Sequence, residues 1–466
     1  SFVRMPVDIR AFREDQGGDV KRVRESERKR GRDEKVVDEV LSADKQWREA
    51  VFQRENLQKK INSEGKKIGL LKREKRPVDK SLFQQLSQMK KRVRELQADE
   101  LKFRKSLNLS LSKVGNVLHE SVPSGLKDVE VDSWGEMDAK LVQDTHTLRS
   151  HEELLAMIGG YNPVKGREVG GSRGYFLTGY AMLLNQALQM YAIRFLTQRK
   201  FTPVQPPVMI RQDVMAKVTQ LSSFDEDLYK VTGGKEDMYL AATSEQPLCA
   251  LHANEHIPEG RLPLLYCGVS TCFRKELTSH GIDAQGIFRV HNFEKVEQFA
   301  ITAPGDSWRV QEKFLENAKH FYKSLGIPYR VVNIAAESLN LAAAKKYDLE
   351  GWFPSQGTCR ELVSCSNCTD YQARALKCRF GYPKLGMSHT SKRGQMVHMV
   401  NSTLCASQRT LCCLLENHQT EAGIRVPEPL IVYVGTAFIP FKTSLTQTLD
   451  AKNLKRKNKS TKKKRN

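Results

Sequence analysis

Apolar side chains recur every three or four residues along two stretches near the start of the chain, residues 36–71 and 82–107. This spacing places them on one face of an α-helix. Pro77 lies between the two stretches and must stop or kink a helix, because proline lacks a backbone donor and restricts the residue before it. Three charged residues interrupt the two series: Arg54, Glu64 and Glu100. The pattern predicts an antiparallel coiled coil over residues 36–111, about 60 Å long at ~1.5 Å per helical residue.

A different pattern, with a period of two, runs through residues 270–299. Two runs rich in β-forming residues flank a segment that contains Gly281 and Gly286, which predicts an antiparallel hairpin with a long turn. Side chains alternate between the two faces of a strand. Arg274 and Glu276 are therefore expected on one face of the first strand. The second strand is expected to present five side chains on one face: Arg289, His291, Phe293, Lys295 and Glu297.

The polar face of this hairpin has two interpretations. A solvated sheet face would account for the charges. A ligand pocket would account for the whole combination, because arginines hold phosphate, an aromatic ring stacks on a base, and carboxylates hold an ammonium or hydroxyl group. Two arginines, two carboxylates and an aromatic ring on one face favour the pocket.

The rest of the second half alternates between strand and helix patterns. Residues 175–196 predict an apolar helix, followed by a strand that is broken near Pro207. Residues 239–245 predict a short strand, and residues 398–403 predict a strand that runs into a helix near Arg409. Taken alone, the first of these helices is equally compatible with a plain core helix.

Phe273, Arg274 and Glu276 form an FRxE element at the hairpin. It resembles the second signature motif of class II aminoacyl-tRNA synthetases. The segments around Pro207 and Arg409 resemble the first and third motifs. Because these motifs agree in order and spacing, the chain is identified as resembling seryl-tRNA synthetases of the eukaryotic cytosolic type over residues 5–441.

The resemblance implies an α+β fold, with an N-terminal antiparallel helical coiled-coil arm and a C-terminal class II synthetase domain built on an antiparallel β-sheet flanked by helices. The expected division is a tRNA-binding domain over residues 1–122, a catalytic domain over residues 123–445, and a basic tail over residues 446–466. Charge and composition predict that the tail is disordered. RNA contact and a localisation signal both remain open for it.

The resemblance also implies the ligands and their residues. The expected activity is the formation of seryl-adenylate from serine and ATP, followed by transfer of serine to tRNA(Ser), and to tRNA(Sec) where that is present. The residues expected to act in catalysis are Arg274, Glu276 and Arg409. Those expected to bind ATP are Arg274, Glu276, Arg289, Val290, Phe293, Glu361, Leu362, Val363, Ser364 and Arg409. Those expected to bind serine are Thr243, Glu245, Arg274, Glu297, Asn401 and Thr403. Glu361 and Ser364 supply the oxygen ligands that Mg²⁺ prefers.

Charge changes the interpretation of the arm. The chain carries a formal net charge of +21, and basic residues outnumber acidic ones in the distal half of the coiled coil. An ordinary coiled coil also has charged outer positions. A basic rod that follows RNA phosphates accounts better for the excess of one sign. We expect four residues to contact tRNA: Lys72, Arg73, Arg92 and Arg94.

All ten cysteines lie between Cys249 and Cys413. Their distribution indicates reduced thiols in a cytoplasmic enzyme rather than a disulfide framework. Cys365 and Cys368 lie near Cys359 and Cys378, but the spacing is poor for a zinc ribbon, so no zinc is expected. No apolar run approaches the ~18–20 residues of a membrane helix, so no membrane association is expected. The family resemblance implies a homodimer.

Two other functions remain open at this stage. One is a synthetase-like protein that has lost catalysis and keeps RNA or partner binding, which the complete set of motif residues disfavours. The other is a structural coiled-coil RNA-binding protein, which would leave about three hundred C-terminal residues without a purpose. Serine-dependent exchange of pyrophosphate into ATP separates all three hypotheses.

Overall fold

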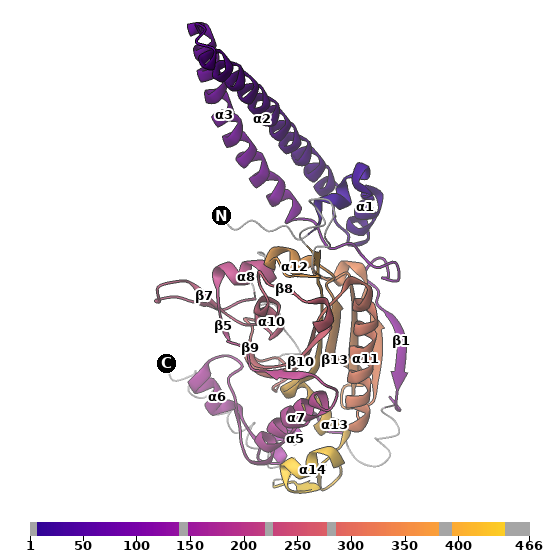
Figure 1. The fold of residues 1–466 in the computed structure, drawn as a ribbon. Helices are drawn as coiled ribbons and strands as arrows, with labels where there is room; N and C mark the ends of the chain where they lie inside the picture. The colour runs from indigo at the N-terminus through magenta and orange to yellow at the C-terminus, as the bar shows by residue number, and fades with distance from the viewer. Residues whose placement is uncertain (1–6, 139–147, 220–226, 277–285, 382–393, 443–466) are drawn as a thin grey trace, which may run out of the picture. The chain divides into compact units, whose positions relative to one another are not determined.

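The computed structural model describes residues 7–138, 148–219, 227–276, 286–381 and 394–442 (Figure 1). The chain divides into two compact units, Ser1–Val117 and Leu118–Asn466. The tail predicted over residues 446–466 lies outside the described residues, and so does most of the turn predicted in the hairpin.

The first unit is helical. Two 3₁₀ turns and the helix α1 precede the long helices α2 (Lys35–Arg73) and α3 (Lys80–Leu111). The short elements are η1 (Ile9–Phe12), η2 (Glu14–Gln16) and α1 (Val20–Lys29). Helix α3 begins after Asp79, whose side chain accepts a hydrogen bond from the backbone N–H of Ser81. The two long helices run side by side as an antiparallel pair (Figure 1). The predicted helical pair with a turn around Pro77 is confirmed.

The seam between α2 and α3 contains many of the residues that the spacing selected, but it begins at Val37, because the predicted Val36 is only half-buried. Its buried apolar side chains are Val37, Val40, Ala43, Ala50, Ile61, Ile68, Val93, Leu96, Leu107 and Leu111. Arg54 and Glu100, which interrupt the two series, face each other across the helices, with 2.7 Å between Nε and Oε2. Each interruption therefore compensates the other, because the two charges form one ion pair.

The second unit is built on an eight-stranded sheet. Its order is β1-β11-β12-β13-β16-β10-β9-β4, with antiparallel neighbours except for the parallel pair β4 and β9. The strands are β1 (Val129–Trp134), β4 (Thr202–Val204), β9 (Leu264–Phe273), β10 (Asn292–Thr302), β11 (Tyr329–Asn333), β12 (Lys345–Phe353), β13 (Thr358–Asn367) and β16 (His398–Ala406). The predicted α+β fold, with an antiparallel sheet flanked by helices, is confirmed.

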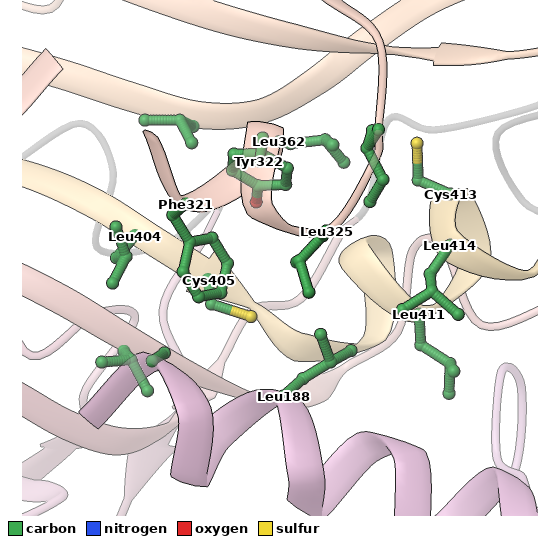
Figure 2. Packing of buried hydrophobic residues seen from close by; sticks show 14 of the residues in the cluster. Leu188, Phe321, Tyr322, Leu325, Leu362, Leu404, Cys405, Leu411, Cys413 and Leu414 are labelled. Carbon is green, nitrogen blue, oxygen red and sulfur yellow. The ribbon is translucent and has the colours of Figure 1, made fainter. Parts of the chain in front are cut away.

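Three helices form the main core against one face of this sheet. They are α7 (Gly179–Thr197), α11 (Ser307–Ser324) and α13 (Ser407–Asn417). Figure 2 shows Leu188 of α7, Phe321 of α11 and Leu411 of α13 converging in this core. Leu362 of β13, together with Leu404 and Cys405 of β16, contributes from the sheet. The core fixes the strands whose opposite faces carry polar side chains.

Helix α7 begins at Gly179, four residues later than predicted. Residues 176–177 instead form the strand β3, which pairs with β2 (Tyr161–Asn162). Backbone pairing therefore competes successfully with the helical pattern at this end. None of the described helices is both long and apolar enough to cross a membrane.

Shorter elements complete the second unit. A second apolar cluster involves α8 (Gln212–Val218), α10 (Glu245–Leu251) and α12 (Tyr371–Leu376) and includes Phe299 and Met399 of the sheet. The remaining helices are α5 (His151–Met157), α6 (Pro163–Gly170) and α14 (Glu428–Val434), with 3₁₀ turns η3 (Glu259–Arg261), η5 (Pro304–Asp306) and η6 (Ala336–Ser338). The remaining strands are β3 (Phe176–Leu177), β5 (Met209–Arg211), β6 (Lys230–Val231), β7 (Met238–Leu240), β8 (His256–Ile257), β14 (Arg379–Phe380), β15 (Gln395–Met396), β17 (Gly423–Arg425) and β18 (Phe438–Pro440).

Candidate active site

The predicted hairpin is present as β9 and β10, which pair in antiparallel register with Phe293 opposite Cys272. Pairing continues one residue beyond β9, because the N–H of Arg274 donates to the carbonyl of His291 at 2.8 Å. The expected alternation holds for Phe293, Lys295 and Glu297, because β10 pairs with β9 without a register shift and Lys295 contacts Glu297. The polar face of the hairpin is thus a real feature of the sheet.

The alternation does not extend to Glu276 and Arg289. Glu276 has a φ of 50°, in the left-handed region, and Arg289 precedes β10. The strand prediction is therefore wrong for these two residues. They still meet, with Nη1 of Arg289 3.2 Å from Oε2 of Glu276. The two residues of this ion pair are placed at the site by backbone outside the strands and not by the alternation of side chains along a strand.

A pocket opens beside the hairpin. Its lining consists of Glu276, Phe288, Arg289, Val290, Phe293, Ala406, Gln408 and Arg409. The guanidinium of Arg274 lies 5.4 Å from the ring centre of Phe293, and that of Arg409 lies 5.0 Å from the ring centre of Phe288. Flat cationic groups above aromatic faces suit a planar, anionic ligand. Five of the predicted ATP-binding residues line this one pocket.

Three pocket residues were missed from the sequence: Phe288, Ala406 and Gln408. An aromatic residue directly before Arg289 was the available signal for Phe288. Gln408 gives no such signal, because its position depends on Glu294: the N–H of Glu294 donates to Oε1 of Gln408 at 3.1 Å. This bond ties the start of α13 to β10.

Arg409 is held where β16 passes into α13. Its Nε donates to the carbonyl of Phe288 at 3.3 Å, and its Nη1 lies 3.5 Å from Oε2 of Glu361. Desolvation alone would raise the pKa of Glu361, but Arg409 and then Lys346 lower it to about 2. Glu361 is therefore ionised at neutral pH, and its side chain remains 45% exposed.

An irregularity in β13 decides how Glu361 and Ser364 are placed. Residues three apart in a regular strand point to opposite faces. In β13, however, Val363 faces Leu349 while Glu361 faces Glu350, so Leu362 is an extra residue. Such a bulge restores Glu361 and Ser364 to the same face. The side chains of Leu362 and Val363 lie in the core, so only their main-chain groups remain for a ligand.

Glu297 lies at the other end of the polar face and is only 3% exposed. Its Oε2 accepts hydrogen bonds from Oγ1 of Thr243 at 2.5 Å, from the Ser244 hydroxyl, and from the N–H of Glu245 at 3.1 Å. Its Oε1 lies 2.5 Å from Nζ of Lys295. Desolvation would raise the pKa of Glu297, but Lys295 and the hydroxyl donors lower it. The carboxylate is a fixed, buried anion.

The segment that reaches Glu297 is not the strand predicted over residues 239–245. Strand β7 ends at Leu240, and Glu245 begins α10. The prediction is wrong there because the backbone turns so that the N–H of Glu245 faces Glu297. Burial raises the pKa of Glu245, and Nε2 of Gln372 donates to its Oε1 at 2.7 Å. Gln372 was missed from the sequence.

Asn401 and Thr403 lie two residues apart on β16, and both are buried. Thr403 is directly opposite Glu297, and Asn401 is opposite Phe299. Nδ2 of Asn401 lies 3.7 Å from Sγ of Cys368. Five of the six residues predicted to bind serine therefore converge at one end of the same polar face, whereas Arg274 lies beside Phe293.

The cysteines considered for a metal are buried apart from Cys359, which is half-buried. Burial raises the pKa of Cys365 and of Cys378 to about 12. Within the described residues, no group of three or more His, Cys, Asp or Glu side chains is arranged to hold a metal ion.

The residues predicted to contact tRNA are all exposed on the helical pair. Lys72 and Arg73 lie in the last turn of α2, and Arg92 and Arg94 lie on α3. Nζ of Lys72 lies 5.4 Å from the ring centre of Phe83, and Arg92 pairs with Glu95 at 2.8 Å. These contacts are exposed, so they leave the charges available to a polyanion.

Comparison with known proteins agrees with this architecture. Residues 229–418 match the tRNA synthetase class II core domain (G, H, P, S and T), so fold and site define a class II aminoacyl-tRNA synthetase. Residues 7–118 match the seryl-tRNA synthetase N-terminal domain. The chain belongs to the seryl-tRNA synthetase family, of the cytoplasmic eukaryotic type, and the resemblance noted from its motifs is confirmed.

The similarity extends over nearly the whole chain. It is 45% identical to the serine–tRNA ligase, cytoplasmic, of Arabidopsis thaliana, over 94% of this chain and 96% of the relative. The crystal structure of the cytoplasmic serine–tRNA ligase of Naegleria fowleri in complex with AMP has a TM-score of 0.85 at 42% identity, over 94% of this chain and 99% of that one. The seryl-tRNA synthetase of Pyrococcus horikoshii complexed with ATP has a TM-score of 0.86 at 37% identity, over 94% and 100%.

Proposed function

We propose that this chain activates serine with ATP and transfers it to tRNA(Ser), and to tRNA(Sec) where that is present, as a cytoplasmic homodimer. The observation that carries the proposal is the continuous polar face of the sheet. Arg274 and Arg409 lie beside aromatic rings at one end, and Glu297 and Thr403 lie at the other. We assign tRNA binding to residues 1–122 and catalysis to residues 123–445, and RNA contact and a localisation signal remain the two open roles for the tail over residues 446–466.

The dimer proposal has support on α7. This helix carries large apolar side chains that are exposed: Met182, Leu183 and Met190. Leu183 and Met190 are two helical turns apart and so lie on the same side of α7, which offers an apolar surface to another chain. A second copy would cover it in the manner that the family's first motif implies.

The first half-reaction joins the serine carboxylate to the α-phosphorus of ATP and releases pyrophosphate. A carboxylate is already a nucleophile, so the reaction needs no general base. The rate enhancement then comes from alignment, which supplies roughly 7–11 kcal/mol, and from cations at the reacting phosphate. Arg274 is assigned to the α-phosphate and serine carboxylate, because a guanidinium binds two oxygens at once.

The remaining roles in binding ATP are assigned to other residues in and beside the pocket. Phe293 is assigned to stacking on adenine, with Arg409 closing the pocket from the side of Phe288. Glu276 is assigned to the adenine amino group or the ribose, and Arg289 to the β- and γ-phosphates. The main-chain groups of Val290, Leu362 and Val363 border the same region. The ion pair between Glu276 and Arg289 orients both residues before ATP binds.

The residues on β13 fit a magnesium site. The bulge at Leu362 gives Glu361 and Ser364 a common face, and a carboxylate with a hydroxyl is a suitable pair of hard oxygen ligands. Glu361 stays ionised because Arg409 and Lys346 lower its pKa. Magnesium bound there supplies positive charge to the phosphates of ATP.

Serine recognition is assigned to the buried end of the face. Glu245 and Thr243 are placed at the ammonium group, with Asn401 beside them. Glu297 and Thr403 are placed at the serine hydroxyl. Oε1 of Glu297 lies against Lys295, and a carboxylate oxygen has a second lone pair that can accept the serine hydroxyl. Alanine has no hydroxyl to place there, so the buried partners assigned to that hydroxyl stay unpaired when alanine binds, which rejects it strongly.

Serine-dependent exchange of pyrophosphate into ATP tests the proposal, with alanine and threonine as controls. If the chain is a seryl-tRNA synthetase, the rate of exchange with serine is expected to exceed the rates with alanine and threonine by orders of magnitude. No exchange with any of the three would favour a catalytically inactive relative. Aminoacylation assays with tRNA(Ser) and tRNA(Sec) transcripts then test the second half-reaction and show which of the two tRNAs is a substrate.

Replacing Thr403 with valine is expected to raise the serine KM about 10-fold, because the variant keeps the volume of the buried side chain and removes one hydroxyl partner. The KM for ATP is expected to stay within about two-fold. Steady-state exchange kinetics measure both constants. Thr358→Val, at the exposed start of β13, is the control. Unaltered selectivity for serine over alanine in Thr403→Val would remove this residue from the pocket.

Neutralising four arm cations is expected to flatten the salt dependence of tRNA binding. Each phosphate contact contributes about −0.7 to −0.9 to the slope of log affinity against log salt, so losing four flattens the slope by about 3. The four residues, all changed to glutamine, are Lys72, Arg73, Arg92 and Arg94. The control changes four exposed cations of the second unit: Lys127, Arg309, Lys313 and Lys323. An unchanged slope in the arm variant would mean that its charges are only a solvated surface.

A further inference from the structure

Asp348 is a buried carboxylate that the proposed reaction has not yet used. It lies on β12 and is only 6% exposed. Its Oδ2 lies 2.9 Å from Nζ of Lys346. Its Oδ1 is buried and has no hydrogen-bond partner among the described residues. Buried polar atoms are almost always hydrogen-bonded, so an unpartnered carboxylate oxygen indicates a missing ligand or water.

The strand register shows where this oxygen points. Asp348 is the direct cross-strand neighbour of Ser364. Direct neighbours in an antiparallel pair share one face of the sheet. The bulge at Leu362 brings Glu361 to that face as well, and after burial the nearby charge of Glu361 contributes to raising the pKa of Asp348. Asp348, Glu361 and Ser364 therefore present oxygen atoms to a common space.

Charges of both signs surround this space, including Arg409, whose Nη1 lies 3.5 Å from Oε2 of Glu361. Lys346, two residues away on β12, holds one oxygen of Asp348 and also lies near Glu361. Glu350 is opposite Glu361 and is bonded by Nε of Arg330 at 2.7 Å. Lys346 thus occupies only one of the two Asp348 oxygens. The ion pair with Lys346 therefore does not account for Oδ1 of Asp348, which has no partner among the described residues.

We propose that Asp348 positions the magnesium ion assigned to Glu361 and Ser364, by accepting hydrogen bonds on Oδ1 from water that the ion keeps. Magnesium usually retains several waters, and outer carboxylates that hold such ligands commonly change metal affinity 10- to 100-fold. Lys346 fixes the carboxylate so that Oδ1 faces the metal. The inference rests on the proposed function, since it deepens the metal site of that reaction.

The test measures metal binding rather than catalysis. Full-length protein is titrated with Mn²⁺ by electron paramagnetic resonance, with a non-hydrolysable ATP analogue present and serine absent. Asp348→Asn is expected to weaken Mn²⁺ binding about 10-fold, while analogue binding without metal stays within about two-fold. Glu312→Gln is the matched control, because this α11 carboxylate bonds Tyr347 on the opposite face of β12. It is expected to leave Mn²⁺ affinity unchanged.

A second variant separates metal positioning from simple charge balance with Lys346. The double change Lys346→Met with Asp348→Asn removes both charges together and also serves if the single variant does not fold. Persistently weak Mn²⁺ binding in it supports the proposal. Recovery of normal affinity would overturn it, because the role of Asp348 would then be to balance Lys346.

Two further outcomes distinguish this inference from the proposed function. Binding that is lost in Glu361→Gln but normal in Asp348→Asn overturns the role of Asp348 and leaves the metal site intact. Absence of analogue-dependent Mn²⁺ binding in the unaltered protein overturns the metal site itself, and the role of Asp348 with it.

Discussion

Changing Arg274 to alanine is expected to reduce serine-dependent pyrophosphate exchange at least about 1000-fold, because the guanidinium is assigned to the phosphate at which bonds form and break. The fold should persist. In the free protein this side chain lies over Phe293 and makes one long hydrogen bond, 3.4 Å from Nε to the carbonyl of Ala242. We therefore expect the melting temperature to stay within about 2 °C.

Two further variants serve as controls for this prediction. Arg309→Ala removes an exposed arginine on α11 and is expected to leave exchange unchanged. Arg274→Lys keeps the charge but loses the two-pronged geometry, so it should recover only a small part of the rate. Exchange by Arg274→Ala within a few-fold of the unaltered protein would contradict the assignment.

Shortening the helical arm is expected to separate the two half-reactions. Residues 58–96 are replaced by a short glycine–serine loop, which keeps the ion pair between Arg54 and Glu100 at the new end. Serine activation should stay within about two-fold, because the assigned pocket residues all follow residue 242. Transfer of serine to tRNA should fall roughly 100-fold or more, since the cations assigned to the phosphates are removed.

The shortened protein supplies its own control, because exchange and transfer are measured on the same sample. Circular dichroism and a melting curve establish that the remaining helices fold. Transfer that persists within a few-fold would show that the arm contributes little to tRNA binding. A parallel loss of exchange would indicate damage to the second unit and not a defect in tRNA binding.

Local patterns predicted much of this molecule. The spacing of three and four residues identified both arm helices, since amphipathic periodicity is a property of one helix and needs no partner to be visible. The period of two identified the hairpin and the shared face of Phe293, Lys295 and Glu297. The motif at residues 273–276, read with its spacing to Arg409, was specific enough to indicate the family.

Other features depended on which segments meet. The ion pair of Arg54 with Glu100 joins residues 46 positions apart, and each residue alone appears only as a defect in its own series. Gln372 reaches Glu245 across 127 positions. Gln408 and Phe288 line the pocket only because α13 packs beside the hairpin. None of these contacts has a signature within a short window of sequence.

The sequence by itself therefore determined the helical arm, the hairpin and which residues can take part in binding or catalysis, because those follow from local periodicity and residue type. The tertiary structure decided which of them act together. One extra residue in β13 places Glu361 and Ser364 on the same face, and the register with β12 adds Asp348 to them. Strand register depends on packing along the whole sheet, so the composition of the site depends on it too.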